Sequence, residues 1–227
     1  MAPSEHETSY EVRREAASAA VVAVGLLAGL AALSRQEGWE LMGLPWWSWL
    51  ALAVPGLVLC ADLWLGARRI GFAGTRAAAI VLLGLIVLGN IVGVCVLVAA
   101  LVTTKNDDLD GVQLLVTTGV IWAANIIVFG LCYWDLDDGG PFERSRHERE
   151  TPDFRFAQDE TPEVARPGWH PRVWDYIFVA LTSATAFSPT DTMPLTLKAK
   201  LLVGTEEFVS LVLIVLVTAR AVSVLGT

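Results

Sequence analysis

The sequence predicts an all-α, polytopic helical membrane protein with four spans, a short fifth hydrophobic helix and a long last helix. Two observations lead to this class. Hydrophobic residues make up 54% of the 227 positions, whereas soluble domains carry about 45–50% apolar residues on a similar count. These residues also gather in long blocks that polar segments separate. The blocks divide the chain into a four-helix transmembrane region (1–134), a polar, proline-rich loop (135–172) and a C-terminal helical hairpin (173–227).

Four apolar blocks in the first region are each long enough, at about 18 residues or more, to cross the hydrocarbon core. Trp46 and Trp47 begin the second block, and tryptophan favours the membrane interface, where its ring is buried and its N–H stays hydrated. Pro55 is expected to kink this second span. The predicted spans cover residues 16–33, 46–65, 77–102 and 112–134.

Two asparagines lie near the middle of the third and fourth spans, Asn90 and Asn125. Because a short loop joins these spans, the two helices should be antiparallel neighbours with both amides at similar depth. A hydrogen bond between membrane helices contributes about 0.6–2 kcal/mol. We expect an interhelical polar pair, and a polar lining for a pathway is the other interpretation.

The segment 135–172 is rich in charged residues and proline, which predicts a solvated loop with little regular structure. It begins with DLDDGG, which lacks the ligand spacing and the closing Glu of a calcium loop. This motif therefore predicts a turn that ends the fourth helix. The three cysteines lie inside apolar runs and the three histidines are far apart, so we predict no metal site and no cofactor.

The apolar run 173–187 is too short for an ordinary span. As a helix it would be about 21 Å long, against about 30 Å for the hydrocarbon core. Two interpretations stay open: a re-entrant helix, or a short span extended through Pro194. The last helix is expected at residues 195–225.

Basic residues predict the orientation, because cytoplasmic loops carry an excess of Lys and Arg. Arg13 and Arg14, and a second arginine cluster between residues 68 and 76, place the N-terminus in the cytoplasm of a cell whose plasma (inner) membrane the protein spans. Four spans then return the loop 135–172 to the cytoplasm.

The fifth run leaves the later topology open. A full crossing by residues 173–194 would make six spans and would place Lys198 and Lys200 near the outer face, which is unfavourable. Arg220, near the C-terminus, would favour that crossing. Charge alone does not decide between the two arrangements.

Residues 175–202, DYIFVALTSATAFSPTDTMPLTLKAKLL, resemble the pore helix, filter corner and inner-helix start of two-span potassium channels. The wider plan, with four spans, YWDLDDGGP, a proline-rich loop and TAFSPTDTMPLT, resembles a family of uncharacterised bacterial multi-pass membrane proteins. The first resemblance implies a pore-loop-like hairpin and a tetramer if a pore forms. The corner Thr185–Asp191 lacks both filter glycines, and Ser188 and Pro189 do not readily supply the positive φ angles of a carbonyl-lined filter.

The corner that remains is rich in hydroxyl groups and has one carboxylate. Its candidate residues are Thr185, Ser188, Thr190 and Asp191. These groups would suit a weakly selective, non-potassium cation path. They would equally suit the start of a helix, where Ser, Thr and Asp are favoured as caps.

Glu206 and Glu207 lie two to three turns into the last helix. An unpaired carboxylate in hydrocarbon is costly, so each group should face protein or water, or be protonated. Adjacent helix positions point about 100° apart, so at least one of the two should meet another helix or a polar cavity. Lys198, Lys200 and the threonine-rich corner are candidate partners.

The sequence contains no recognisable catalytic constellation, so we do not expect an enzyme. The net charge of −8 argues against nucleic acid as a partner. The expected function is an ion-channel-like or transport component in the lipid bilayer, working as a homo-oligomer. The alternative is a non-conducting membrane scaffold or sensor that uses the loop 135–172 as a docking segment.

Overall fold

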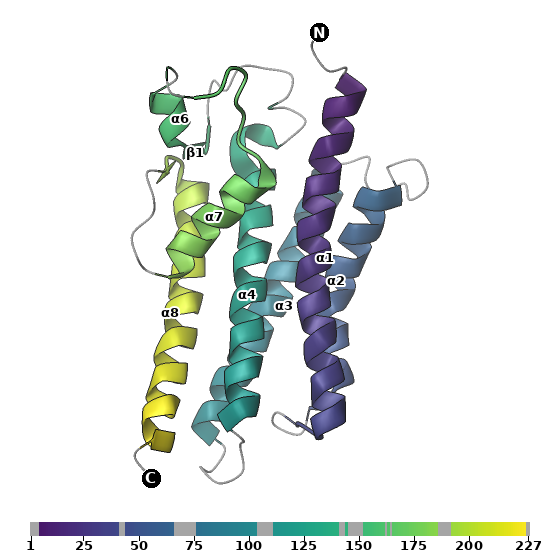
Figure 1. Ribbon diagram of the computed structural model, residues 1–227, viewed down its shortest axis with the longest axis vertical. Helices are drawn as coiled ribbons and strands as arrows, with labels where there is room; N and C mark the ends of the chain where they lie inside the picture. Colours follow the sequence, from purple (N-terminus) through teal and green to yellow (C-terminus); the bar gives the residue numbers. More distant parts are fainter. Residues whose placement is uncertain are drawn as a thin grey trace.

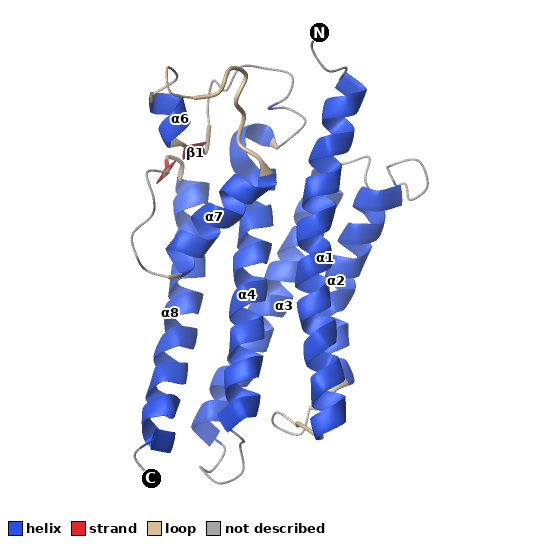
Figure 2. Cartoon of the chain, in the orientation of Figure 1, coloured by secondary structure: helices blue, strands red, loops and turns tan. Residues whose placement is uncertain are grey.

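A computed structural model describes residues 5–40, 44–65, 76–103, 111–140, 144, 152–161, 163, 165–185 and 192–225, with side chains described for a somewhat smaller set. Helices make up most of these residues (Figure 2). The predicted all-α class is therefore confirmed. The predictions for Arg68, Arg69, Ser188, Thr190 and Asp191 lie outside the described residues.

Five long helices form an elongated bundle (Figure 1). Helices α1, α3 and α8 run in one direction, and α2 and α4 run in the opposite direction. Helix α4 is central, since it contacts α1, α3, α7 and α8. The long helices are α1 (Glu5–Glu37), α2 (Trp47–Leu65), α3 (Arg76–Thr103), α4 (Gly111–Leu136) and α8 (Leu197–Leu225).

The short helix α7 (Val173–Ala184) does not cross the bundle. It starts at the end where α1 begins and α4 ends, which we call the loop end, and descends obliquely beside α8 (Figure 1). The chain is back at the loop end in β2 (Met193–Pro194), which pairs antiparallel with β1 (Phe154–Arg155) in the register Phe154↔Pro194 and Arg155↔Met193. The start of α7 and strand β2 therefore lie at the same end of the bundle, and the choice between a re-entrant helix and a short span stays a prediction.

A glycine allows α7 to lie close to α4. A Cβ atom built on Gly130 would stand 2.7 Å from both Cα and Cγ1 of Ile177. Real side chains do not approach this closely, so the two helix backbones are in near contact at this level. The buried face of α7, which includes Tyr176 and Ala180, packs into the core that this contact creates.

The loop after α4 is more ordered than the sequence predicts. The expected helix stop is confirmed: η1 (Asp137–Gly139) follows α4, with positive φ at Asp138, Gly139 and Gly140. Full solvation, which the sequence predicts for the loop 135–172, does not hold for residues 152–161, although their regular structure is short. They form β1 and α6 (Ala157–Glu160) and bury Phe154 and Phe156 in the core shared by α4, α7 and α8. Two aromatic side chains in a polar stretch outweigh the tendency of their neighbours to be solvated.

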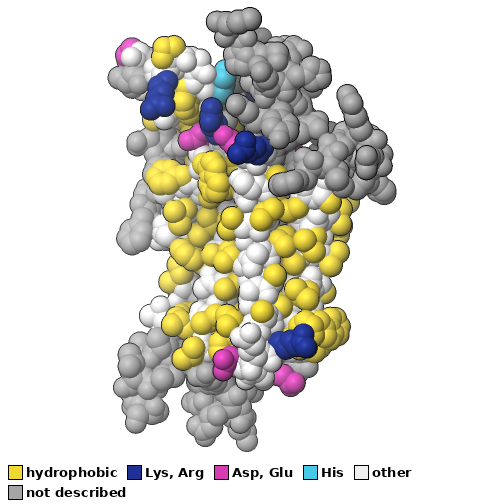
Figure 3. All heavy atoms as spheres, turned by 45° about the vertical axis from the view of Figure 1, so that its right-hand side comes forward, with side chains coloured by type: hydrophobic (Ala, Val, Ile, Leu, Met, Phe, Trp, Pro, Cys, Tyr) yellow, Lys and Arg dark blue, Asp and Glu magenta, His cyan; other side chains and the backbone are white. Residues whose placement is uncertain are grey.

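Large apolar side chains cover much of the bundle surface. Figure 3 shows them as a broad band, with charged side chains at its upper and lower borders. Among the described residues, two helical stretches are long and apolar enough to cross a bilayer, Arg14–Glu37 and Val112–Gly139. Shorter apolar stretches cover Trp47–Val58, Val87–Ala99 and Val173–Ala184. The prediction of four spans stays a prediction.

Candidate functional site

Glu206 lies fully buried between α8 and α4, with 0% of its surface exposed. The Tyr133 hydroxyl on α4 hydrogen-bonds Glu206 Oε2. The other carboxyl oxygen, Oε1, has no hydrogen-bond partner within the described part of the chain. The sequence predicted that at least one of the paired glutamates would meet another helix, and Glu206 confirms this. The observed partner is a tyrosine, which was not among the candidate partners named from the sequence.

A second polar contact joins the same two helices. Asn125 Nδ2 donates to Ser210 Oγ at 3.2 Å, and both residues are 0% exposed. Ser210 lies one turn after Glu206 on α8, so both contacts belong to one face of that helix. The Asn90 side chain lies outside the described set, so the Asn90–Asn125 pair stays a prediction. Sequence patterns alone identify Asn125 but not Ser210, because a serine in an apolar helix is common.

Glu207 points away from the contact between α8 and α4. It is exposed, and α8 also exposes the large apolar side chains Leu201, Phe208 and Leu211, which are 63%, 68% and 51% exposed. Helix α8 therefore exposes a carboxyl group as well as large apolar side chains. The angular separation of adjacent helix positions, about 100°, accounts for the different environments of Glu206 and Glu207.

Thr185 is the described residue of the predicted polar corner. Its Oγ1 donates to the carbonyl oxygens of Leu181 at 3.0 Å and Thr182 at 3.1 Å, so it hydrogen-bonds the last turn of α7. The Thr185 hydroxyl is therefore already hydrogen-bonded to the backbone of α7. Whether the rest of the corner forms a helix cap or a permeation path stays a prediction, because those residues are outside the described set.

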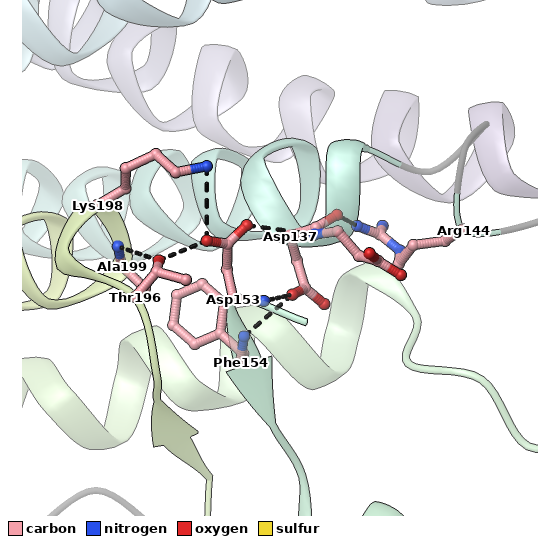
Figure 4. A network of polar contacts seen from close by, with 8 residues as sticks. Asp137, Arg144, Asp153, Phe154, Thr196, Lys198 and Ala199 are labelled. Carbon is pink, nitrogen blue, oxygen red and sulfur yellow. Dashed lines mark hydrogen bonds and ion pairs between the residues drawn. The ribbon is translucent and has the colours of Figure 1, made fainter. Parts of the chain in front are cut away.

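Asp137 is a buried residue that sequence reasoning assigned only to a turn. Its Oδ1 accepts the backbone N–H of Asp153 at 2.7 Å and that of Phe154 at 3.0 Å (Figure 4). The Tyr176 hydroxyl on α7 donates to Oδ2, and Arg144 Nη1 donates to the Asp137 backbone carbonyl. A carboxylate that accepts several hydrogen bonds is well solvated by the protein itself. Asp137 thus joins the end of α4, strand β1 and the start of α7.

Asp153 extends these contacts to α8. The Thr196 hydroxyl donates to its Oδ1, Lys198 Nζ lies 3.6 Å from the same oxygen, and the Leu195 N–H donates to its backbone carbonyl at 2.8 Å. We call Asp137 and Asp153 with these partners the Asp137–Asp153 network. The DLDDGG motif and its aspartates were visible in the sequence, but their partners lie in segments far along the chain, so the network could not be deduced.

Aromatic rings lie between the Asp137–Asp153 network and Glu206. The Phe154 ring is fully buried, with its centroid 5.0 Å from that of Tyr133 and 6.1 Å from that of Tyr176. Phe156 contacts Tyr176 from the other direction, at 5.2 Å. Phe154 therefore lies between Tyr133, which hydrogen-bonds Glu206, and Tyr176, which hydrogen-bonds Asp137.

The described residues contain no group of three or more His, Cys, Asp or Glu side chains that could hold a metal ion. No protein-family model, no curated protein and no solved structure matches the sequence. The function proposed below therefore rests on the positions of the described side chains. The arrangement offers one carboxyl group buried inside the bundle, one on its apolar surface, and a hydrogen-bonded segment at the loop end.

Proposed function

We propose that the protein is an integral membrane protein with five crossings, α1–α4 and α8, and with α7 as a re-entrant helix. Large apolar side chains exposed on each long helix support this, because soluble proteins rarely expose such extended apolar surface. The polar groups of α4 and α8 pair inside the bundle, as expected for helices in lipid. Each of the five long helices has such an exposed apolar side chain. Examples, with the exposed fraction of each residue, are Val21 (51%), Val54 (52%), Leu85 (49%), Leu115 (62%) and Leu211 (51%).

The same arrangement supports an orientation with the loop end in the cytoplasm. Because α7 is re-entrant, the start of α8 with Lys198 and Lys200 lies at the same end as Arg14. In a six-span topology, Lys198 and Lys200 would lie near the outer face. In this arrangement they lie on the cytoplasmic side, as expected from the excess of Lys and Arg in cytoplasmic loops. The C-terminus would lie outside the cell.

We further propose that the protein is an ion-channel-like or transport component that works as a homo-oligomer. The observation that carries this is the exposed carboxyl group of Glu207 on a helix that also exposes Leu201, Phe208 and Leu211. Ionisable side chains within membrane segments almost always face protein or a water-filled path rather than lipid. The outer face of α8 should therefore adjoin another subunit or water.

The layout of α7 and α8 supports the same proposal. A short re-entrant helix followed by a long apolar helix is the arrangement that the resemblance to two-span potassium channels implies. The missing filter glycines argue for a path lined by side-chain oxygen atoms instead of backbone carbonyls. A single hairpin cannot enclose such a path, so several chains would be needed, and four if the resemblance extends to assembly.

A second candidate function has its own support. Glu206 and Asn125 find their hydrogen-bond partners inside one chain, as expected of a protein whose interior is not a path. The ordered segment around β1 and α6 would then be the docking surface of a non-conducting scaffold or sensor.

A flux measurement separates the two candidates. Purified full-length protein in liposomes would be tested for passage of monovalent cations, alongside Glu207→Gln and the control Glu160→Gln. Glu160 lies on α6 and pairs with Arg155 at the surface. The channel-like proposal expects flux in the wild type and the control, and a clear loss in Glu207→Gln. Absence of flux in the wild type would remove it and leave the scaffold or sensor.

A further inference from the structure

The Glu206 carboxyl group has no basic partner among the described side chains. It is 0% exposed, it takes part in none of the ion pairs that these side chains form, and Tyr133 bonds one of its two oxygens. As an anion it would be a buried charge without a counter-ion, which is strongly unfavourable. As a neutral acid it would leave only a single uncharged oxygen without a partner, a much smaller cost.

The ionisable groups around Glu206 are few. On α8 itself, Lys200 and Glu207 are exposed and Lys198 is bound to the Asp137–Asp153 network. The elements that pack against α8 are α3, α4, α7 and β2. Of the ionisable residues on them, Tyr133 is the one seen to hydrogen-bond Glu206. Those residues are Arg76 and Cys95 on α3, Cys132, Tyr133 and Asp135 on α4, and Asp175 and Tyr176 on α7.

Toward the loop end, the Phe154 ring packs on Tyr133, the hydrogen-bond partner of Glu206. The same ring stands between the rings of Tyr133 and Tyr176. The segment that carries it is held by the N–H of Phe154 on Asp137 Oδ1 and by the pairing of β1 with β2. Figure 4 shows that the hydrogen bond to Asp137 comes from the Phe154 backbone. The position of the ring therefore does not depend on the chemistry of the side chain.

We propose that Glu206 is a proton-binding site, in which the carboxyl group holds one exchangeable proton and the Phe154 side chain closes the site toward the loop end. This inference rests on the proposed membrane function and names the ligand of its buried carboxyl group. On release, the O–H bond of the acid breaks, the electron pair stays on Glu206, and the proton passes to a water molecule admitted from the loop end. The Tyr133 hydroxyl then donates to the carboxylate, and uptake reverses these steps.

Infrared difference spectroscopy on full-length protein in lipid nanodiscs tests the proton directly. The background is Glu207→Gln, so that the neighbouring carboxyl group does not contribute. We expect the carbonyl stretching band of a protonated carboxyl group at neutral pH, and loss of that band when Glu206→Gln is added. Adding Tyr133→Phe instead should keep the band and shift its frequency, because one hydrogen bond is removed. Identical spectra with and without Glu206→Gln would overturn the proposal.

Exchange of the band in D2O tests the role of Phe154. Phe154→Ala should accelerate the exchange several-fold, whereas the control Phe156→Ala, a ring in the same segment that packs on Tyr176 and Trp169, should accelerate it much less. If Phe154→Ala does not yield folded protein, Phe154→Leu replaces it, with the same expectation in a smaller degree. Equal acceleration by both changes, or none, would contradict closure by Phe154. Neither readout depends on ion flux, so a protein that shows the band but conducts no ions would contradict the transport proposal alone.

Discussion

Gly130 on α4 and Ile177 on α7 lie in near backbone contact: a Cβ atom on Gly130 would stand 2.7 Å from the Ile177 Cα atom. The position of α7 depends on this glycine, because the Ile177 Cα atom that a Cβ atom would meet belongs to the backbone and cannot rotate away. The contact brings Tyr176, one residue earlier on α7, to Asp137 at the end of α4. The packing of α7 and the hydrogen bonds of the loop end are thus parts of one arrangement.

The substitution Gly130→Ala is expected to destabilise the fold. The added methyl group must push α7 away from α4, and overpacking of this kind costs about 1–3 kcal/mol. Thermal unfolding in detergent, followed by circular dichroism, would measure the change. Gly119→Ala on the same helix is the control, because a Cβ atom there meets nothing within 4 Å. Gly119→Ala should be neutral or stabilising, because Ala has the higher helix propensity. Equal stabilisation by both substitutions would contradict the close contact with α7.

Replacing Asp137 by Asn should loosen the loop end. The amide keeps one acceptor oxygen where the carboxylate has two, so at least one of the donors from Asp153, Phe154 and Tyr176 loses its partner. A buried donor left without a partner costs about 1–3 kcal/mol. Limited proteolysis should then cut the segment 152–161 faster than in the wild type.

Asp138→Asn serves as the control for that experiment. Asp138 has a positive φ angle, a conformation that Asn tolerates well, and its contact to Asp153 uses the backbone N–H. Proteolysis at the wild-type rate in Asp137→Asn would mean that the segment is held by Phe154 and Phe156 alone.

Asn125 and Ser210 should be energetically coupled. The single substitutions Asn125→Ala and Ser210→Ala, with the double substitution, form a thermodynamic cycle for their 3.2 Å hydrogen bond. Cross-helix hydrogen bonds in membranes contribute about 0.6 kcal/mol on average and at most about 1.7 kcal/mol, and the coupling energy should fall in this range. Free energies of unfolding in mixed micelles provide the measurement. Strict additivity would show that the contact does not stabilise the pair of helices.

Thiol labelling would test the five-crossing topology. In a background with Cys60, Cys95 and Cys132 replaced by Ala, single cysteines would be introduced as Gln36→Cys and Glu160→Cys, both at exposed positions on opposite ends of the bundle. A membrane-impermeant reagent applied to intact cells should label the first and spare the second. Labelling of both from one side would contradict the membrane arrangement, and labelling of the second alone would reverse the orientation.

Part of the candidate site could be predicted from the sequence. A glutamate pair inside an apolar helix stands out, and helical geometry requires the two to face different surroundings. The identity of the partner did not follow, because Tyr133 lies 73 residues away and looks like an ordinary interface aromatic. Asp137, Asp153 and Phe154 escaped detection for the same reason: composition describes a segment as polar but does not reveal which few side chains are buried.

The sequence by itself determined the helical class, the positions of the long helices and the turn that ends α4, because these follow from local apolar blocks and from residues that favour left-handed backbone angles. Only the tertiary structure decided that α7 does not cross the bundle, that Glu206 faces inward while Glu207 faces outward, and that residues 152–161 bury two of their side chains. Each of these depends on contacts between segments far apart in the chain: Gly130 with Ile177, Tyr133 with Glu206, and Asp137 with Phe154. Such contacts form through shape and paired hydrogen bonds in three dimensions, and no local pattern encodes them.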